Sequence, residues 1–255
     1  MKHTGEIIAR QKSDWWFDFF PAFRPVFDGI QGKVTNSEVA FIIRKLGLKA
    51  GMKFLDCPCG IGRISIPLAR KGIRVAGVDI IGEYLDEVAV KARRQKLPIT
   101  LIESDMRRID FESEYDAAGN ICTSFGYFAR ESDNLLVLKK LYKALKPEGK
   151  ILIQTINRDW LIKNFTPRDW SEIDNIKIFQ SRVIDYQSSV LVGRWRFLKN
   201  GEDREFEVKL RLYSYHELYN MMVMAGFKNI QGFGSTKDDP IGSNNRMMFV
   251  VGEKR

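Results

Sequence analysis

The sequence predicts an α/β protein with a doubly wound, mostly parallel seven-stranded sheet, an antiparallel last strand, an N-terminal helical cap and a β-hairpin insertion. Two observations support this fold class. From residue 36 to residue 157, short apolar runs alternate with segments of helical periodicity, a pattern that produces βαβ units with right-handed crossovers and a parallel sheet. After residue 157 the pattern changes to two long alternating strands around Asn200-Gly201, a strong hairpin signal.

The elements of the sheet can be placed in order along the chain. Thr35 and Glu38 form a predicted capping box for a helix over 39–46. Ser214 and Glu217 form a second one, for the last helix, which is expected to end before residue 226. Further helices are expected over 64–69, 84–94 and 135–145, and strands over 53–55, 74–79, 99–102, 115–121, 150–155, 227–234 and 247–251.

Two regions flank this alternating core. Residues 1–35 form a predicted aromatic cap, which Pro21 and Pro25 are expected to break into short helical pieces. Residues 36–255 form the predicted main domain, and residues 158–213 within it form an inserted lid that contains the hairpin strands 190–198 and 205–213. On the hairpin, Arg194 and Arg196 are expected to pair with acidic residues of the second strand.

The composition is that of a globular protein. The chain has 255 residues, 44% of them hydrophobic and 29% charged, which suits one large domain or one domain with an insertion. No apolar run reaches the roughly 18 residues of a membrane span, and no apolar segment of the secretory type follows the first basic residues. Three cysteines cannot form a disulfide framework, so we expect a reducing, cytoplasmic setting.

The most informative motif is the turn that follows the first predicted strand. It delivers Asp56, Gly60 and Gly62 to the start of a helix, where the backbone can approach a ligand closely. Asp79 ends the next strand 19 residues after Gly60 (79 − 60), the distance at which an acid binds a ribose hydroxyl in Rossmann-like folds. The turn and the acid together predict a nucleoside-binding crevice in a Rossmann-like domain.

The same turn indicates which kind of nucleotide is bound. Ser65 stands where the dinucleotide fingerprint requires its third glycine. The carboxylate of Asp56 would repel a pyrophosphate but suits a ligand that carries an ammonium and a sulfonium group.

At this point the chain resembles the class I S-adenosylmethionine-dependent methyltransferases. Asp56, Gly60 and Gly62 match the first motif of that family, and Asp79 matches its ribose acid. The family's adenine-contacting acid and its apolar neighbour are matched by Ser104-Asp105-Met106. The segment that lines the methyl-transfer site is matched by residues 116–128, and the turn before the fifth strand by residues 145–150. The resemblance implies S-adenosyl-L-methionine as the cofactor and S-adenosyl-L-homocysteine as the product. The cofactor-binding residues that we infer are Asp56, Cys57, Cys59, Gly60, Gly62, Arg63, Asp79, Ile80, Ser104, Asp105, Met106, Asn120 and Ile121.

The acceptor side of the site is less clearly marked. Related small-molecule methyltransferases cover the acceptor with N-terminal helices and an inserted hairpin, and this chain has both patterns. The candidate substrate residues are Trp16, Phe20, Tyr127, Asn157, Trp195 and His216. No residue stands out as a general base, so no catalytic residue is assigned. No metal site is expected, because the cysteines are spaced C-x-C and the chain has two histidines.

The reaction predicted from these features is methyl transfer to a small-molecule nucleophile. The net charge of +9 leaves an RNA or protein methyltransferase as an alternative, although the basic residues are spaced like solvated helix faces. Residues 120–123 read Asn-Ile-Cys-Thr and lack the Asn/Asp-Pro-Pro-aromatic signature of methylases that act on base amino groups. A non-catalytic cofactor-binding protein is the third alternative. The methylated atom and the oligomeric state stay open.

Overall fold

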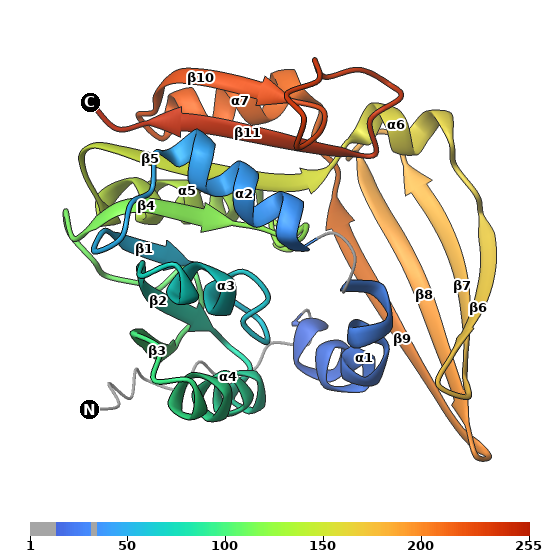
Figure 1. The fold of residues 1–255 in the computed structure, drawn as a ribbon. Coiled ribbons are helices and arrows are strands. Elements are labelled where there is room, and N and C mark those ends of the chain that lie inside the picture. The colour runs from blue at the N-terminus through green and yellow to red at the C-terminus, as the bar shows by residue number, and fades with distance from the viewer. Residues whose placement is uncertain (1–13, 32–34) are drawn as a thin grey trace.

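A computed structural model of the protein describes residues 14–31 and 35–255 (Figure 1). The main sheet has seven strands in the order β10-β11-β5-β4-β1-β2-β3, and the second sheet has four, in the order β6-β7-β8-β9. The main-sheet strands are β1 (Lys53–Asp56), β2 (Arg74–Asp79), β3 (Ile99–Glu103), β4 (Tyr115–Asn120), β5 (Leu145–Ile156), β10 (Lys228–Phe233) and β11 (Met247–Glu253). The helices are α1 (Trp16–Gln31), α2 (Thr35–Leu46), α3 (Ser65–Arg70), α4 (Gly82–Arg94), α5 (Glu131–Ala144), α6 (Arg158–Lys163) and α7 (Tyr215–Met224).

The topology of the main sheet confirms the predicted fold class. β3, β2, β1, β4 and β5 pair in parallel, whereas β11 runs antiparallel to both β5 and β10. Helices α2 and α3 cover one face and α5 and α7 the other (Figure 1), and apolar side chains of each pair pack on that face of the strands. The carboxyl ends of the parallel strands therefore open at one edge, where ligands bind in open α/β sheets.

Helix α1 differs from its prediction. It is continuous, although Pro21 and Pro25 lie inside it. The two prolines are four residues apart and both are exposed, so they share the face of the helix that points away from the protein. A proline inside a helix costs about 3 kcal/mol, but burying an aromatic side chain returns about 1.5–3 kcal/mol, and α1 packs several. Rings on its other side, including Phe19 and Phe20, hold the helix together.

The insertion is a four-stranded antiparallel sheet, larger than the predicted hairpin. The expected hairpin strands are present as β8 (Val190–Lys199) and β9 (Glu202–Arg211), and β6 (Arg168–Ile173) and β7 (Ile176–Asp185) were not anticipated. The overlooked signal is Asp174-Asn175, whose φ angles of 50° and 62° suit a tight hairpin turn. Arg194 lies 3.6 Å from Glu207, as the register implies.

The insertion projects from the main sheet, and α1 lies between the two sheets (Figure 1). Phe19 of α1 packs on Ile178 and Phe197 of the inserted sheet. The backbone N–H of Arg211, at the end of β9, donates to the Gly126 carbonyl at 2.8 Å, which joins the insertion to the loop after β4. Over the residues that the structure describes, no helix has the length and apolar character that crossing a membrane requires.

Candidate cofactor and active site

A pocket lies at the carboxyl ends of β1, β2, β3 and β4 and is bounded on its other side by α1. Its empty volume is about 920 Å³, part of which is open to solvent. Of the predicted cofactor-binding residues, those that line it are Asp56, Cys57, Cys59, Gly60, Arg63, Asp79, Ile80, Ser104, Asp105, Met106 and Ile121. Segments that are far apart in the sequence therefore meet in one cavity.

The turn after β1 shapes the floor of the pocket. Gly60 and Gly62 have φ angles of 53° and 79°, in the left-handed region that favours glycine. Gly62 lies outside the lining, and a Cβ atom there would come within 3.0 Å of Val88 in α4, so this glycine allows the turn to pack on the helix. Cys59 packs against β2, where a Cβ atom at Gly77 would lie 2.9 Å from its Sγ atom.

Asp79 occupies the end of β2 with little exposure to solvent. One carboxylate oxygen accepts from the backbone N–H of Gly60 at 2.7 Å, and the other accepts from that of Ile81 at 3.0 Å. Burial raises the pKa of Asp79 to about 6, although the backbone donors oppose the shift. Backbone amides thus fix a hydrogen-bond acceptor on the pocket wall.

Asp56 is a second buried acid in the same pocket. Its side chain accepts from the Ser65 hydroxyl at 2.6 Å, so the serine that replaces the third glycine of the dinucleotide fingerprint holds this acid. Burial raises the pKa of Asp56 to about 7, against the Ser65 hydrogen bond and the Arg63 charge. Two carboxyl groups that are costly to ionise without a partner make the cavity favourable for a cation.

Asn120 lies just behind the lining, at the end of β4. Its Nδ2 donates to the Cys57 carbonyl at 2.9 Å and lies 3.6 Å from the Met106 sulfur. Its Oδ1 atom is buried and has no hydrogen-bond partner among the described residues. The Asn120 side chain thus ties the end of β4 to the turn that shapes the pocket floor, while the donor set that fits the positively charged S-adenosylmethionine is that of the two buried acids, Asp56 and Asp79.

A polar network that the sequence did not reveal supports the loop after β4. Arg63 contacts both Glu38 of α2 and the sulfur of Cys122, and Gln154 of β5 donates to Glu38 at 2.7 Å. Cys122 and the next residue have φ angles of 64° and 58°, and the Gln154 side chain and carbonyl accept from their backbone N–H groups at 3.0 Å. Burial raises the pKa of Cys122 to about 11, although Arg63 opposes the shift.

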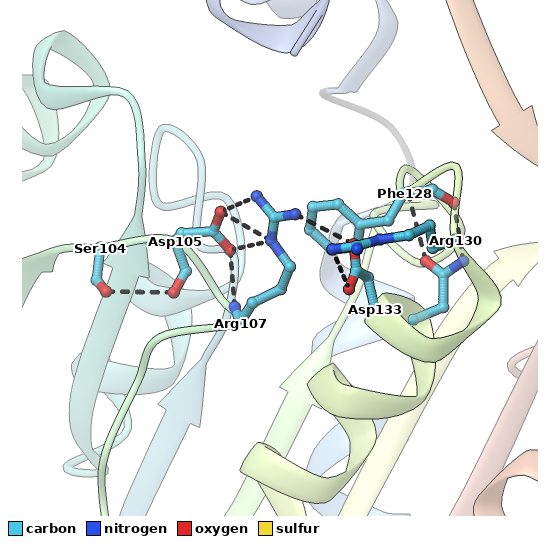
Figure 2. A network of polar contacts seen from close by, with 7 residues as sticks. Ser104, Asp105, Arg107, Phe128, Arg130 and Asp133 are labelled. Carbon is cyan, nitrogen blue, oxygen red and sulfur yellow. Dashed lines mark hydrogen bonds and ion pairs between the residues drawn. The ribbon is translucent and has the colours of Figure 1, made fainter. Parts of the chain in front are cut away.

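The third acid, Asp105, follows β3 and is bound by Arg107. The guanidinium and the backbone N–H of Arg107 both donate to the Asp105 carboxylate, at distances from 2.5 to 3.1 Å (Figure 2). The guanidinium also lies 4.1 Å from the centre of the Phe128 ring, which lines the pocket.

The predicted substrate residues separate into two groups. Trp16, Phe20 and Tyr127 line the pocket, together with Ser124 and Phe128 of the predicted 116–128 segment and with Tyr84, which had not been assigned to the site. Trp16 and Phe20 come from α1 and the others from main-domain segments, so only the folded chain brings these rings together.

The other three candidates lie outside the pocket lining. The Asn157 side chain caps α6 by accepting from the Asp159 N–H at 3.0 Å and also donates to two carbonyls of the loop before β11. Trp195 packs edge-on against Phe19 and a neighbouring phenylalanine on the insertion side of α1. His216 is exposed in the first turn of α7, 3.1 Å from Asn220. These positions indicate structural contacts.

This arrangement is that of a class I S-adenosylmethionine-dependent methyltransferase. A family model described as "Methyltransferase domain" matches residues 54–149. The chain is 30% identical over 204 residues to the "Putative methyltransferase YqeM" of Bacillus subtilis (strain 168), and the match covers 77% of this chain and 82% of that protein. The chain belongs to this methyltransferase family, and it is an S-adenosylmethionine-dependent enzyme.

Solved structures agree with this fold. An S-adenosylmethionine-dependent methyltransferase from Clostridium acetobutylicum ATCC 824 superposes with a TM-score of 0.78 at 16% identity, over 93% of this chain and 98% of that one. CalS10, an amino pentose methyltransferase from Micromonospora echinaspora solved with bound S-adenosylmethionine, superposes with a TM-score of 0.63 at 19% identity, over 98% of this chain and all of that one.

Proposed function

We propose that the protein transfers the methyl group of S-adenosylmethionine to a small-molecule nucleophile held between the strand ends and α1. The observation that carries this proposal is the closure of the pocket by α1. Trp16 is 6% exposed and lines the pocket, so the helix forms a wall that a polymer chain would have to displace.

Contacts on both sides hold this wall. The Tyr84 hydroxyl of α4 donates to the Phe20 carbonyl at 2.6 Å, and Arg24 forms a two-pronged ion pair with Glu87 at 2.7 and 2.8 Å. The inserted sheet packs on the other side of α1. We therefore assign residues 14–31 of the predicted cap and residues 158–213 to a lid over the acceptor, whereas residues 1–13 and 32–34 of that cap lie outside the described residues.

The pocket geometry supports the following placement of the cofactor. Asp79 would accept hydrogen bonds from the ribose hydroxyls, and Asp105 would accept from the adenine amino group. Asp56 would face the positively charged methionyl end. Gly62 supports the site from behind the lining by shaping the turn.

The chemistry then requires little acid or base catalysis. The cofactor supplies a methyl group that its sulfonium already activates, so the chain's residues must align the acceptor and exclude water. Burial raises the pKa of the Tyr127 phenol above its ordinary value, and burial also raises the pKa of Cys57 and Cys59. These groups stay protonated at neutral pH, which favours an acceptor that arrives with a free lone pair, such as a neutral amine. The amino pentose acceptor in the name of CalS10 is of this kind.

Methyl-labelled S-adenosylmethionine tests this proposal. The purified protein is incubated separately with a small-metabolite extract, with total RNA and with a protein extract, and each fraction is counted for label. We expect label in the metabolite fraction, above all among amines, and about ten- to a hundredfold less of it with an Asp79→Ala variant at a cofactor concentration below the dissociation constant. Label in RNA or protein would favour the alternative that the positive charge suggests. Cofactor binding without transfer to any fraction would favour a non-catalytic binding protein.

A further inference from the structure

The Asp105–Arg107 contact is the starting point, because the loop after β3 folds back on itself there. The Asp105 side chain is 2% exposed and the Arg107 side chain 21%. The Arg107 guanidinium reaches both carboxylate oxygens of Asp105, and its backbone N–H adds a further bond to Oδ1 at 2.7 Å. A two-pronged guanidinium–carboxylate pair fixes the plane of the carboxylate, which a single bond would not do.

Arg107 also reaches the opposite wall of the pocket. Its guanidinium lies over the Phe128 ring and its Nη1 atom is 3.5 Å from Asp133 in the first turn of α5 (Figure 2). Phe128 is itself anchored, since the Asn134 amide donates to its carbonyl at 3.0 Å and its ring packs edge-on against Trp16. Arg107 thus touches one residue from each of two pocket walls that come from different segments of the chain.

We propose that Arg107 is a positioning residue that sets the enzyme's preference for an aminopurine cofactor. It holds the Asp105 carboxylate in the orientation that accepts from an exocyclic amino group, and it keeps Phe128 against the same end of the pocket. The inference rests on the cofactor placement proposed above, in which Asp105 faces the adenine edge.

A merely structural arginine would affect stability without changing which purine is preferred. The discriminating measurement is therefore the ratio of two dissociation constants, one for S-adenosyl-L-homocysteine and one for S-inosyl-L-homocysteine, which carries an oxo group in place of the adenine amino group. A carboxylate fixed to accept from the amino group is left facing an oxygen when the inosyl compound binds, so we expect the wild-type protein to prefer the adenosyl compound about tenfold or more.

Arg107→Met keeps much of the side-chain length over Phe128 but removes every donor to Asp105. We expect it to reduce the purine preference to about twofold or less, mainly by weakening the adenosyl compound. Arg107→Lys should recover part of the preference, because an ammonium can still donate to Asp105 without fixing its plane. The matched control is Arg130→Met, since Arg130 contacts Asp133 at 3.1 Å from the solvent side, and this variant should keep the full preference.

The dissociation constants are measured by calorimetric titration of five full-length proteins with both compounds: the wild type, Arg107→Met, Arg107→Lys, Arg130→Met and Asp105→Asn. A full purine preference in Arg107→Met or Arg107→Lys, or an equal loss in Arg130→Met, would overturn the assignment of Arg107. Asp105→Asn separates this failure from a failure of the cofactor placement. If Asp105→Asn loses the preference while both Arg107 variants keep it, the placement holds and the role of Arg107 is wrong. If Asp105→Asn keeps the preference, the adenine edge does not face Asp105 and both proposals fail.

Discussion

The two sides of the pocket are built in different ways. On the strand side, each of the three acids lies at or just after the end of a strand. Asp56 accepts from Ser65, nine positions away, and Asp105 accepts from Arg107, two positions away. Asp79 accepts from Ile81 and from Gly60 of the adjacent glycine turn. On the cap side, α1 is held mainly by rings that pack across long sequence distances, among them Phe19 on Phe197. Recognition on the first side depends on directional polar groups, and on the second side on shape and apolar area.

This contrast suggests how one fold separates its two tasks. Carboxylates fixed by backbone amides at the ends of parallel strands can hold a constant cofactor, because the sheet determines their spacing. The rings that α1 presents to the pocket can be substituted without moving the strand ends, because the helix lies between the two sheets and is part of neither. We therefore expect substitutions in the cap to affect stability and acceptor choice, and substitutions at the strand ends to affect the cofactor.

The largest effect should come from the cap. Trp16→Ala removes a ring that is 6% exposed and packs edge-on against Phe128 at 5.5 Å, so we expect it to lower the free energy of unfolding by about 3–5 kcal/mol in denaturant titrations. Trp170→Ala is the matched control, since that ring is 63% exposed on the inserted sheet, and its cost should stay within about 0.5 kcal/mol. Equal costs for the two variants would mean that α1 does not pack on the main domain in this way.

A substitution on the strand side should affect binding more than stability. Asp79→Ala removes the acceptor that two backbone amides hold at the end of β2, and we expect about ten- to a hundredfold weaker binding of S-adenosylhomocysteine, because a hydrogen bond to a charged group contributes about 1.5–3 kcal/mol. Calorimetry measures the affinity, and circular dichroism checks that the variant is folded. Asp203→Ala, which removes an exposed acid of the inserted sheet, should bind like the wild type. Unchanged affinity in a folded Asp79→Ala protein would contradict the ribose assignment.

The same acid predicts a pH dependence of cofactor affinity. Burial raises the pKa of Asp79 from 3.8 to about 6, so the free protein ionises this acceptor only above that pH. The ionisation of Asp79 alone should then lower the affinity for S-adenosylhomocysteine by about tenfold between pH 7 and pH 5, with proton release on binding near pH 6. Asp79→Asn should remove this step and leave the contribution of Asp56, whose pKa burial raises to about 7. A flat wild-type profile in calorimetric titrations would show that neither acid changes its ionisation on binding.

These raised pKa values also predict the sign of a stability change. Because folding favours the protonated form of both acids, their contribution to stability is fully present below pH 3.8 and is lost as the pH rises through about 6 for Asp79 and about 7 for Asp56. Bound cofactor should offset part of that loss. S-adenosylhomocysteine should therefore raise the melting temperature more at pH 8 than at pH 5. An equal rise at both pH values would contradict the link between ligand binding and the ionisation of these acids.

The sequence predicts the strand side of the pocket better than the cap side. Every strand of the main sheet was expected, because short apolar runs and glycine turns are local signals, but β5 begins at Leu145, five residues before the predicted start and inside the predicted turn over 145–150. Local signals also identified the acids at the strand ends. The continuity of α1 was not predicted, since Pro21 and Pro25 are local helix breakers and the packing that outweighs them is distant in sequence. Asp174-Asn175, the turn between β6 and β7, was a local signal that had been overlooked.

The parts of the site that sequence patterns missed are the side chains that act from behind the lining. Glu38 was interpreted as a helix-capping acid, yet it holds Arg63 and Gln154, and the latter is 116 residues away. Asn157 and Trp195 were expected near the acceptor because strand ends and aromatic rings are typical of binding sites, and they lie outside the pocket lining. The order and twist of the strands determine which polar side chains face one another. The spacing of residues along the sequence does not specify that order or twist directly.

The smallest expected effect concerns the polar contact between the two sides of the pocket. Arg24 of α1 and Glu87 of α4 are each about one quarter exposed, and Lys91 also contacts Glu87, at 2.5 Å. If rings hold the cap, this pair should add little. A double-mutant cycle with Arg24→Ala and Glu87→Ala should give a coupling energy of about 0.2–1 kcal/mol, because solvent and salt screen such pairs.

The Arg24 hydrogen bond lowers the pKa of Glu87 to about 2, so the coupling should be present above pH 4.5 and fade as the pH falls toward 2. Lys91→Ala is the control, since it removes a partner of Glu87 without touching α1 and should leave cofactor affinity unchanged. A coupling above about 2 kcal/mol, or loss of cofactor binding in Arg24→Ala, would mean that a polar latch holds the cap, and the contrast between the two sides would fail.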